Sequence, residues 1–237
     1  MNPHVRYLKR AIDMVGAGVG LVLTAPLFPI IAAAIRLESP GPIFYSQVRA
    51  GSNPDPKRSG RVDTFRMWKF RSMRNDAEKG KAVFAAKGDP RITKVGNFLR
   101  KTRLDELPQF WNVLVGEMSI VGPRPERPEM LENLAAAIPM FEERTRFVKP
   151  GITGLAQVSL DYMGRMDDSM PIAKYRDQLL NPFKLEGAEN AIADDMRTKL
   201  LFDMAYAASL ESVRTFLATD LGILIKTPIV MLGARGR

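Results

Sequence analysis

Two adjacent carboxylates, Asp105 and Glu106, are the residues of this chain with the clearest potential for chemistry. The 237-residue chain has no cysteine, and its single histidine, His4, lies near the N-terminus. Thiolate nucleophiles, serine–histidine–aspartate chemistry and metal sites built on Cys or His are therefore disfavoured. Carboxylates, lysines, arginines, hydroxyls and a hard cation remain as the groups that could carry out a reaction.

The acidic pair has two interpretations. At a helix start, Asp105 would accept backbone N–H bonds and Glu106 would favour the positive end of the helix dipole, with Arg100, Lys101 and Arg103 merely neutralising the pair. Alternatively, an aspartate held ionised by these groups could attack phosphorus and form an acyl phosphate. The second carboxylate could then help to hold Mg²⁺ against the phosphate oxygens. The residues alone leave both interpretations open.

Further cationic side chains could bind phosphate. Arg124 lies between Pro123 and Pro125, which limit the backbone and would present the guanidinium for bidentate phosphate contact at little ordering cost. Lys69 and Arg71 alternate with aromatic residues, so on a strand they would share one face suited to an anionic substrate or to lipid headgroups. A rigid surface turn and an exposed strand face are the alternative interpretations.

The charge of the chain is unevenly distributed. Residues 36–103 contain 17 Lys and Arg against 6 Asp and Glu, whereas residues 104–237 contain 15 against 19. The basic block suggests an anionic partner, such as a membrane surface, a phosphate-rich substrate or nucleic acid, although a solvated basic face would look the same. Contents of 46% hydrophobic and 26% charged residues exclude a disordered chain and a polytopic transporter.

An apolar segment precedes the basic block. Met14–Ile35 contains 22 consecutive uncharged residues, enough to cross about 30 Å of hydrocarbon as a helix. Pro26 and Pro29 interrupt it, and basic residues flank both of its ends, which favours keeping both ends on one side of the bilayer. We expect a proline-broken re-entrant hairpin in which the Thr24 hydroxyl bonds a freed backbone group. An ordinary single-pass anchor is the alternative.

Residue periodicity and turn signals predict the elements that position these side chains. The predicted elements up to residue 121 are strands at 43–48 and 62–70 paired as a hairpin, a helical piece at 75–86, helices at 93–101 and 105–116, and a strand at 118–121. Thr93 is expected to cap the first of these two helices, with Val95, Phe98 and Leu99 on its apolar face, and the second is expected to face Leu107, Phe110, Trp111 and Leu114 inward. The predicted elements after residue 121 are helices at 126–138 and 139–147, a strand into Val158, an amphipathic helix at 189–215 and an apolar run at 216–232 that lies on the membrane. The prediction is a helix-rich α+β protein, with a membrane hairpin at residues 1–38 and a membrane-associated catalytic domain, with short strands and interfacial amphipathic helices, at 39–237.

Several short motifs occur together along most of the chain. They are Ser39-Pro40-Gly41-Pro42, Lys69-Phe70-Arg71-Ser72-Met73, Leu104-Asp105-Glu106-Leu107-Pro108-Gln109, Asn112-Val113-Leu114, Val121-Gly122-Pro123-Arg124-Pro125-Glu126 and Pro150-Gly151-Ile152-Thr153-Gly154. Lys9-Arg10 with Asp13 precedes them, and Lys199, Asp203, Tyr206, Ser209 and Asp220 follow. In this order the motifs resemble the bacterial sugar transferase family, the small monotopic polyprenyl-phosphate phosphoglycosyl transferases.

The resemblance implies an activity and a set of site residues. The enzyme would transfer a sugar 1-phosphate from a UDP-sugar to polyprenyl (undecaprenyl) phosphate and release UMP, the first membrane step in assembling a glycan such as an exopolysaccharide or lipopolysaccharide. Asp105 would be the nucleophile that carries the sugar phosphate, and Glu106 would assist it with Mg²⁺. The nucleotide and phosphate groups would meet Pro123, Arg124, Pro125, Lys69, Arg71 and Arg100.

The resemblance also implies a location and partners. The chain would lie on the cytosolic face of the bacterial inner membrane, with a UDP-sugar, polyprenyl phosphate and an anionic lipid bilayer as partners, no nucleic acid, and a homodimer left open. Two departures from the family pattern are Ala25-Pro26 in place of Ser-Pro, and Arg103 where a small polar residue is usual. The rival interpretation is a non-enzymatic, membrane-attached binder of nucleic acid or anionic lipid that uses the basic block.

Overall fold

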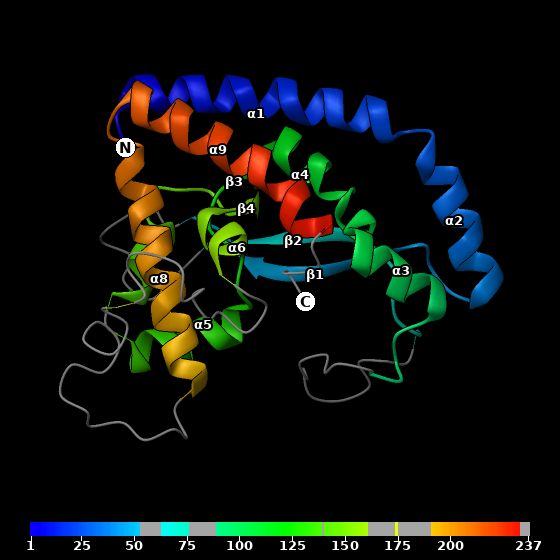
Figure 1. Cartoon of the computed structure of the whole chain (residues 1–237). Helices are drawn as coiled ribbons and strands as arrows, with labels where there is room; N and C mark the ends of the chain where they lie inside the picture. Colours follow the sequence, from blue (N-terminus) through cyan, green and yellow to red (C-terminus); the bar gives the residue numbers. More distant parts are fainter. Residues whose placement is uncertain (53–62, 76–88, 139, 161–173, 175–190, 233–237) are drawn as a thin grey trace.

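The computed structural model describes residues 1–52, 63–75, 89–138, 140–160, 174 and 191–232. A long N-terminal helix lies along one side of the molecule, the C-terminal helix lies beside it, and two small two-stranded sheets lie beneath them (Figure 1). The predicted helix-rich α+β class with short strands is confirmed. The predicted helical piece at 75–86 falls outside the described residues except for its first one.

The N-terminal apolar segment forms two helices, α1 (Pro3–Thr24) and α2 (Leu27–Glu38), which meet at an angle of 60°. Pro26 lies at the break, whereas Pro29 lies in the first turn of α2, where a backbone N–H has no partner within the helix. The Thr24 hydroxyl donates to the Gly20 carbonyl at 2.7 Å, so it does bond a backbone group beside the bend. Among the described helices none alone has the length and apolarity to cross a bilayer, but the bent pair meets both criteria together.

The predicted hairpin is present. Strand β1 (Phe44–Ala50) pairs antiparallel with β2 (Thr64–Phe70), with Phe44 opposite Phe70. The β2 side chains of Phe65 and Met67 are buried, as the period of two requires for a sheet with one covered face.

Helix α3 (Lys94–Thr102) follows the hairpin and begins as predicted. The Thr93 hydroxyl accepts the Gly96 N–H at 2.9 Å and so caps the helix. Leu99 is buried, but Phe98 is 58% exposed, so the expectation that it faces inward is wrong.

The predicted helix at 105–116 begins later than expected. Arg103 adopts a left-handed conformation with φ of 58°, which ends α3 and starts the single 3₁₀ turn η1 (Leu104–Glu106). Helix α4 (Gln109–Val115) begins only after Pro108 and ends as predicted at Gly116, where φ is 91°. Trp111 was expected to face inward but is 55% exposed, because this short helix packs through its other side, which carries Phe110 and Val113.

A second, parallel sheet replaces part of the predicted strand pattern. Strand β3 (Ser119–Val121) pairs with β4 (Gly151–Thr153), and the chain then turns into helix α6 (Leu155–Ser159) instead of continuing as a strand into Val158. The reason is that β3 ends at Val121 and leaves no partner strand for residues after Thr153. Between the strands lie α5 (Pro128–Ala137) and the 3₁₀ helix η2 (Phe141–Thr145).

The C-terminal region forms α8 (Ala191–Ser209) and α9 (Val213–Leu232), not one helix to residue 215 followed by an apolar run. A new helix starts because the Ser212 hydroxyl accepts the Thr215 N–H at 3.2 Å, as an N-cap residue does. Pro228 lies inside α9 without ending it. Tyr206 and Phe216, one from each helix, are buried in a core cluster that also contains Val5.

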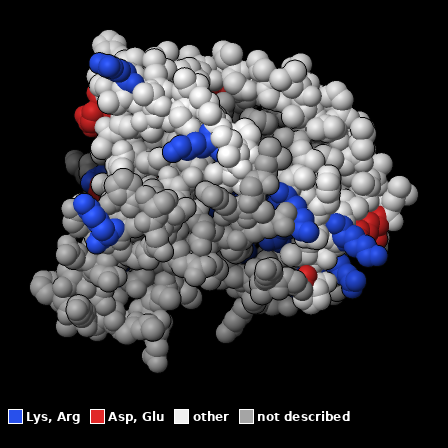
Figure 2. All heavy atoms as spheres, in the orientation of Figure 1, with Lys and Arg blue, Asp and Glu red and all other residues white. Residues whose placement is uncertain are grey.

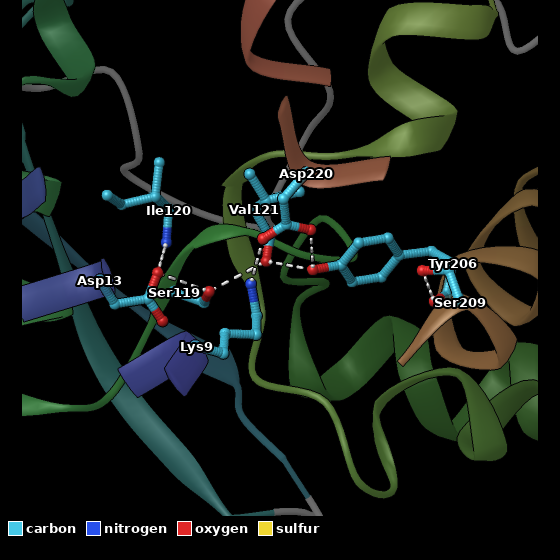
Figure 3. Close-up of polar contacts among 8 residues, drawn as sticks. All are labelled: Lys9, Asp13, Ser119, Ile120, Val121, Tyr206, Ser209 and Asp220. Atoms are coloured by element: carbon cyan, nitrogen blue, oxygen red, sulfur yellow. Dashed lines mark hydrogen bonds and ion pairs between the residues drawn. The ribbon is translucent and has the colours of Figure 1, made fainter. Parts of the chain in front are cut away.

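Buried polar contacts fasten α1 to the rest of the protein (Figure 3). Lys9 Nζ lies 2.9 Å from Asp220 Oδ2, and the Tyr206 hydroxyl lies 2.9 Å from Asp220 Oδ1 and 3.0 Å from the Val121 carbonyl oxygen. Asp13 Oδ1 accepts the Ile120 N–H at 2.9 Å and the Ser119 hydroxyl at 3.0 Å. Strand β3 is therefore held by α1, α8 and α9 together.

Removing one member of this network leaves a buried charge without its partner. We expect Lys9→Met to lower the free energy of unfolding by about 3 kcal/mol, because the Asp220 carboxylate stays buried without the cation that compensates it. The matched double variant Lys9→Met/Asp220→Asn removes both charges and should recover most of that loss. Thermal unfolding of the full chain in detergent measures both variants. Equal unfolding midpoints for the single and the double variant would contradict the prediction, because they would show that the unpaired Asp220 carboxylate does not cause the loss of stability.

Candidate active site

A small pocket opens between the β1–β2 hairpin, η1, α4 and the turn after β3. Its lining includes three cationic side chains and one carboxylate; the residues are Arg49, Met67, Lys69, Glu106, Gln109, Arg124, Pro125, Gly151 and Ile152. The structure therefore brings together four of the predicted site residues from segments far apart in the sequence. In the face drawn in Figure 2, Lys and Arg side chains gather mainly toward the α3 end of the molecule, while the surface over α1 and α2 is largely uncharged.

Asn112 sets the relative position of α4 and β2. Its side chain is fully buried, accepts the Trp68 N–H at 3.1 Å and donates to the Arg66 carbonyl at 2.7 Å. A side-chain amide can satisfy one donor and one acceptor of a strand in this way. The strand that carries Lys69 is thereby held against the helix that follows the acidic pair.

Glu106 is the paired member of the two carboxylates. Its Oε1 atom lies 2.7 Å from Lys69 Nζ, 3.7 Å from Arg103 Nη1 and 4.0 Å from Arg124 Nη2. Burial alone would raise the pKa of Glu106, but the positive charges of Lys69, Arg124 and Arg103 outweigh it and hold the pKa well below its ordinary value. Glu106 is therefore ionised across the physiological range.

Asp105 is the unpaired member. The residue is 6% exposed, and its Oδ1 atom has no hydrogen-bond partner in the described part of the chain. Burial raises the pKa of Asp105 to about 6, Lys69 opposes the rise, and the negative charge of Glu106 adds to it. Near neutral pH Asp105 is thus mostly ionised while one oxygen lacks a donor, which is the condition of a carboxylate that is available to react.

The helix-capping interpretation of the acidic pair is wrong. Asp105 and Glu106 lie inside the 3₁₀ turn, two or more residues before α4 begins at Gln109. The N-cap residue of α4 is Pro108, which has no side-chain group to cap the helix.

The backbone of the Pro-Arg-Pro turn is fixed from several directions. The Pro123 carbonyl accepts the Gly151 N–H at 2.8 Å, and the Pro125 carbonyl accepts Arg49 Nη1 at 3.3 Å. The guanidinium of Arg124 itself stays 43% exposed and extends toward Glu106. The prediction that the prolines present this arginine at low ordering cost is therefore supported by additional bonds from outside the turn.

Arg144 completes this support, and sequence reasoning missed it. Its guanidinium, 2% exposed, donates to the Arg124 carbonyl at 2.9 Å and to Asp203 Oδ2 at 2.8 Å. Nothing in the acidic and basic run around residue 144 distinguishes this arginine from a surface residue. For Asp203, the only signal in the sequence is its place among the motif residues of the family resemblance.

Three of the residues predicted to bind nucleotide or phosphate, Pro123, Arg71 and Arg100, lie outside the pocket lining, and Asp105 lies beside the lining residue Glu106 without being part of the lining. Arg71 follows Phe70, the last residue of β2. The alternation of side chains along the strand, which would place Arg71 on the same face as Lys69, therefore ends before it. Its buried guanidinium donates to the Ser39 and Pro40 carbonyls at 2.6 and 2.9 Å, so it fastens the chain that leaves α2. Arg100, in the last turn of α3, is near enough to help lower the pKa of Asp105 but does not line the pocket.

The acidic pair fits a magnesium ion. The described residues contain no cluster of three or more His, Cys, Asp or Glu that could enclose a metal by itself. Mg²⁺, however, is commonly bound by one or two carboxylates, with substrate phosphates and water completing its shell. Asp105 Oδ1 is an unpartnered oxygen of this kind. Asp105 and Glu106 could therefore hold Mg²⁺ in the presence of a phosphate substrate.

Comparison with known proteins places the chain in a family. The profile of the bacterial sugar transferase family matches residues 4–234, so the chain belongs to that family. The chain is 43% identical over 168 residues to the UDP-N-acetylgalactosamine-undecaprenyl-phosphate N-acetylgalactosaminephosphotransferase of Aeromonas hydrophila. It is 47% identical over 154 residues to the UDP-glucose:undecaprenyl-phosphate glucose-1-phosphate transferase of Escherichia coli K12. It is 47% identical over 141 residues to the putative undecaprenyl-phosphate N-acetylgalactosaminyl 1-phosphate transferase of Bacillus subtilis 168.

The matched regions cover different shares of these proteins. They amount to 71%, 65% and 59% of the present chain for the Aeromonas, Escherichia and Bacillus proteins, respectively. They span 38% of the Aeromonas protein and 31% of the Escherichia protein, but 74% of the Bacillus protein. The family resemblance indicated by the sequence motifs is confirmed.

The two carboxylates should respond oppositely to neutralisation. The raised pKa of Asp105 means that its ionisation opposes folding, so Asp105→Asn should raise the unfolding midpoint at pH 7.5. The lowered pKa of Glu106 means that its charge stabilises the fold, so Glu106→Gln should cost about 2 kcal/mol. Thermal unfolding between pH 4 and 8 tests this. The gain from Asp105→Asn should shrink as the pH falls through 6, and two equal losses at pH 7.5 would contradict the assignment.

Proposed function

We propose that the chain is a phosphoglycosyl transferase that moves a sugar 1-phosphate from a UDP-sugar to undecaprenyl phosphate and releases UMP. The observation that carries the proposal is the unpaired, mostly ionised carboxylate of Asp105 beside a pocket lined by Arg49, Lys69 and Arg124. The relatives named above act on undecaprenyl phosphate, and two of their names specify a UDP-sugar.

In the first half-reaction, a carboxylate oxygen of Asp105 attacks the phosphorus attached to the sugar. The bond from that phosphorus to the oxygen that bridges the two phosphates breaks, and UMP leaves with the electron pair. Lys69 and Arg124 already compensate Glu106 and place positive charge where the anionic substrate enters. When bound, Mg²⁺ would supply further positive charge between the carboxylates and the phosphate oxygens.

In the second half-reaction, a phosphate oxygen of undecaprenyl phosphate attacks the same phosphorus. The bond between phosphorus and the Asp105 oxygen breaks, and the carboxylate is regenerated. The product is the sugar linked to the lipid through a diphosphate. One nucleophile thus serves two substrates that need not be bound together.

The second substrate is a lipid, and the apolar surface of the chain suits it. Exposed apolar side chains run along α1 and α2, among them Val15, Val19, Val22, Leu23 and Ile30, and along α9, among them Leu221, Ile225 and Ile229. We infer that α1 and α2 form a re-entrant hairpin in one leaflet and that α9, beside α1 in Figure 1, lies in the interface. The basic block would add about 1 kcal/mol per Lys or Arg near anionic headgroups on the cytosolic face of the inner membrane.

A non-enzymatic binder of nucleic acid or anionic lipid explains the site less well. Such a protein would gain nothing from burying two adjacent carboxylates beside its cations, since both would repel the ligand. Asp105→Asn separates the two functions, because a binder would retain its function and the transferase would release no UMP.

The covalent intermediate can be detected directly. The full chain in detergent, incubated with Mg²⁺ and a panel of UDP-sugars but no lipid acceptor, should gain the mass of one sugar phosphate on the peptide that contains Asp105. Intact-mass and peptide mass spectrometry measure this, with Asp105→Asn as the matched control that should gain nothing. UMP release that depends on the lipid acceptor, with no adduct in its absence, would favour direct displacement.

The pKa of Asp105 sets an expected pH dependence. Protonation removes the nucleophile, so the rate of the first UMP release should fall about tenfold per pH unit below pH 6 and level off above it. Rapid-quench measurement of a single turnover between pH 4.5 and 8 tests this, with thermal unfolding at each pH to confirm that the protein stays folded. A profile that is flat from pH 8 to 4.5 would contradict Asp105 as the reacting group.

A further inference from the structure

Two buried donors in the same pocket are left unused by the reaction described above. Within the described residues, Arg49 Nε and Gln109 Nε2 have no hydrogen-bond acceptor, and both are shielded from solvent. Gln109 as a whole is 3% exposed. A buried donor without an acceptor costs about 1–3 kcal/mol, so two such donors in one pocket indicate a ligand rich in acceptor oxygens.

Hydrogen bonds fix the Arg49 guanidinium in the pocket, and burial restricts the Gln109 side chain. Arg49 donates through Nη1 to the Pro125 carbonyl at 3.3 Å and through Nη2 to Gln47 Oε1 at 2.6 Å, which fixes the plane of the guanidinium. Gln109 is the first residue of α4 and follows Pro108, so its backbone is constrained on both sides. The Nε atom of Arg49 is therefore a preorganised donor, and the buried amide of Gln109 is a second donor whose backbone, though not its side chain, is constrained.

The charges around Arg49 favour an anion. The pKa of Arg49 is lowered to about 10, mainly by burial and also by the positive charges of Arg124 and Arg127, while the negative charge of Glu126 opposes the shift. Lys69 also lines the pocket, but its charge is taken up by Glu106 at 2.7 Å. Glu106 is shared with Lys69 and Arg103 and lies 4.0 Å from Arg124, so the positive charges of Arg49 and Arg124 are only partly compensated and would be stabilised by a further anion.

We propose that Arg49 and Gln109 bind the phosphate that stays with the departing nucleoside monophosphate. The assignment rests on the proposed function, because it takes the same pocket as the donor site. The transferred phosphorus must approach Asp105, and the second phosphate lies one bridging oxygen away. Gln109, four residues after Asp105, and Arg49, which bonds the Pro-Arg-Pro turn, supply donors beside that position. As the bridging bond breaks, negative charge grows on the leaving phosphate and strengthens both bonds.

Binding of UMP tests the assignment without any chemical step. Equilibrium dialysis of labelled UMP against the full chain in detergent should show about tenfold weaker binding for Gln109→Leu and for Arg49→Lys, which keeps the charge but lacks the Nε donor. Uridine, which has no phosphate, should bind equally to all three proteins. The matched control for Gln109→Leu is Gln157→Leu, because the atom of Gln157 that has no partner in the described structure is the acceptor Oε1 and not a donor. The matched control for Arg49→Lys is Arg36→Lys, because Arg36 is exposed and donates to the Gly41 carbonyl. Both should stay within twofold of the parent.

A second variant guards against a loss of folding. Gln109→Glu replaces the amide donor by a carboxylate of nearly the same shape, which would repel a phosphate. If the ligand is a phosphate, Gln109→Glu should therefore bind UMP more weakly than Gln109→Leu does, at comparable thermal stability. UMP affinities within twofold of the parent in Gln109→Leu and Arg49→Lys would overturn the assignment. So would failure of the parent to bind UMP, even if the adduct on Asp105 forms. Loss of UMP binding in both variants without any adduct would keep the assignment and reject the covalent mechanism.

Discussion

Two adjacent buried carboxylates share a small number of cations, and the cations compensate the charge of one carboxylate more than that of the other. The properties of the site depend on this difference. Glu106 forms an ion pair with Lys69 at 2.7 Å and lies near Arg103 and Arg124, so it stays ionised. Asp105, next to it, has one oxygen without a hydrogen-bond donor among the described residues, and burial raises its pKa. The pair is thereby divided into a structural anion that organises the cations and a carboxylate left available for phosphorus or a metal.

The opposite side of the pocket depends on backbone contacts. Strands β3 and β4 approach so closely that a Cβ on Gly151 would lie 2.1 Å from the Gly122 nitrogen, which makes a side chain there incompatible with the sheet. The turn that follows β3 carries Arg124, and its carbonyls are bound by Gly151, Arg144 and Arg49. Arg124 is therefore placed by bonds to its backbone, and its side chain remains available.

Helix α1 connects the apolar surface to this site. Exposed apolar residues such as Val15 and Val19 lie on the same helix as Lys9 and Asp13, which are buried and bonded to Asp220 and to β3. Since β3 leads directly into the Pro-Arg-Pro turn, the position of α1 in a lipid leaflet would determine the height of the pocket above that leaflet. In the proposed re-entrant arrangement, the buried polar residues of α1 would link membrane attachment to the position of the pocket.

The amino-acid sequence by itself determined the elements with strong local signals. The hairpin, the Thr93 cap, the end of α4 at Gly116 and the break at Pro26 follow from alternation, a capping hydroxyl and backbone limits, and the motif order indicated the family. The tertiary structure decided what depends on contacts between distant segments. It made residues 155–159 a helix because β4 had no partner beyond Thr153, directed Arg71 to the chain after α2, and brought Arg144 to the Arg124 carbonyl. The tertiary structure also determined that Lys69 pairs with Glu106 and not with Asp105. The register of the strands and the contacts of Asn112, which join distant segments, place Lys69 against Glu106.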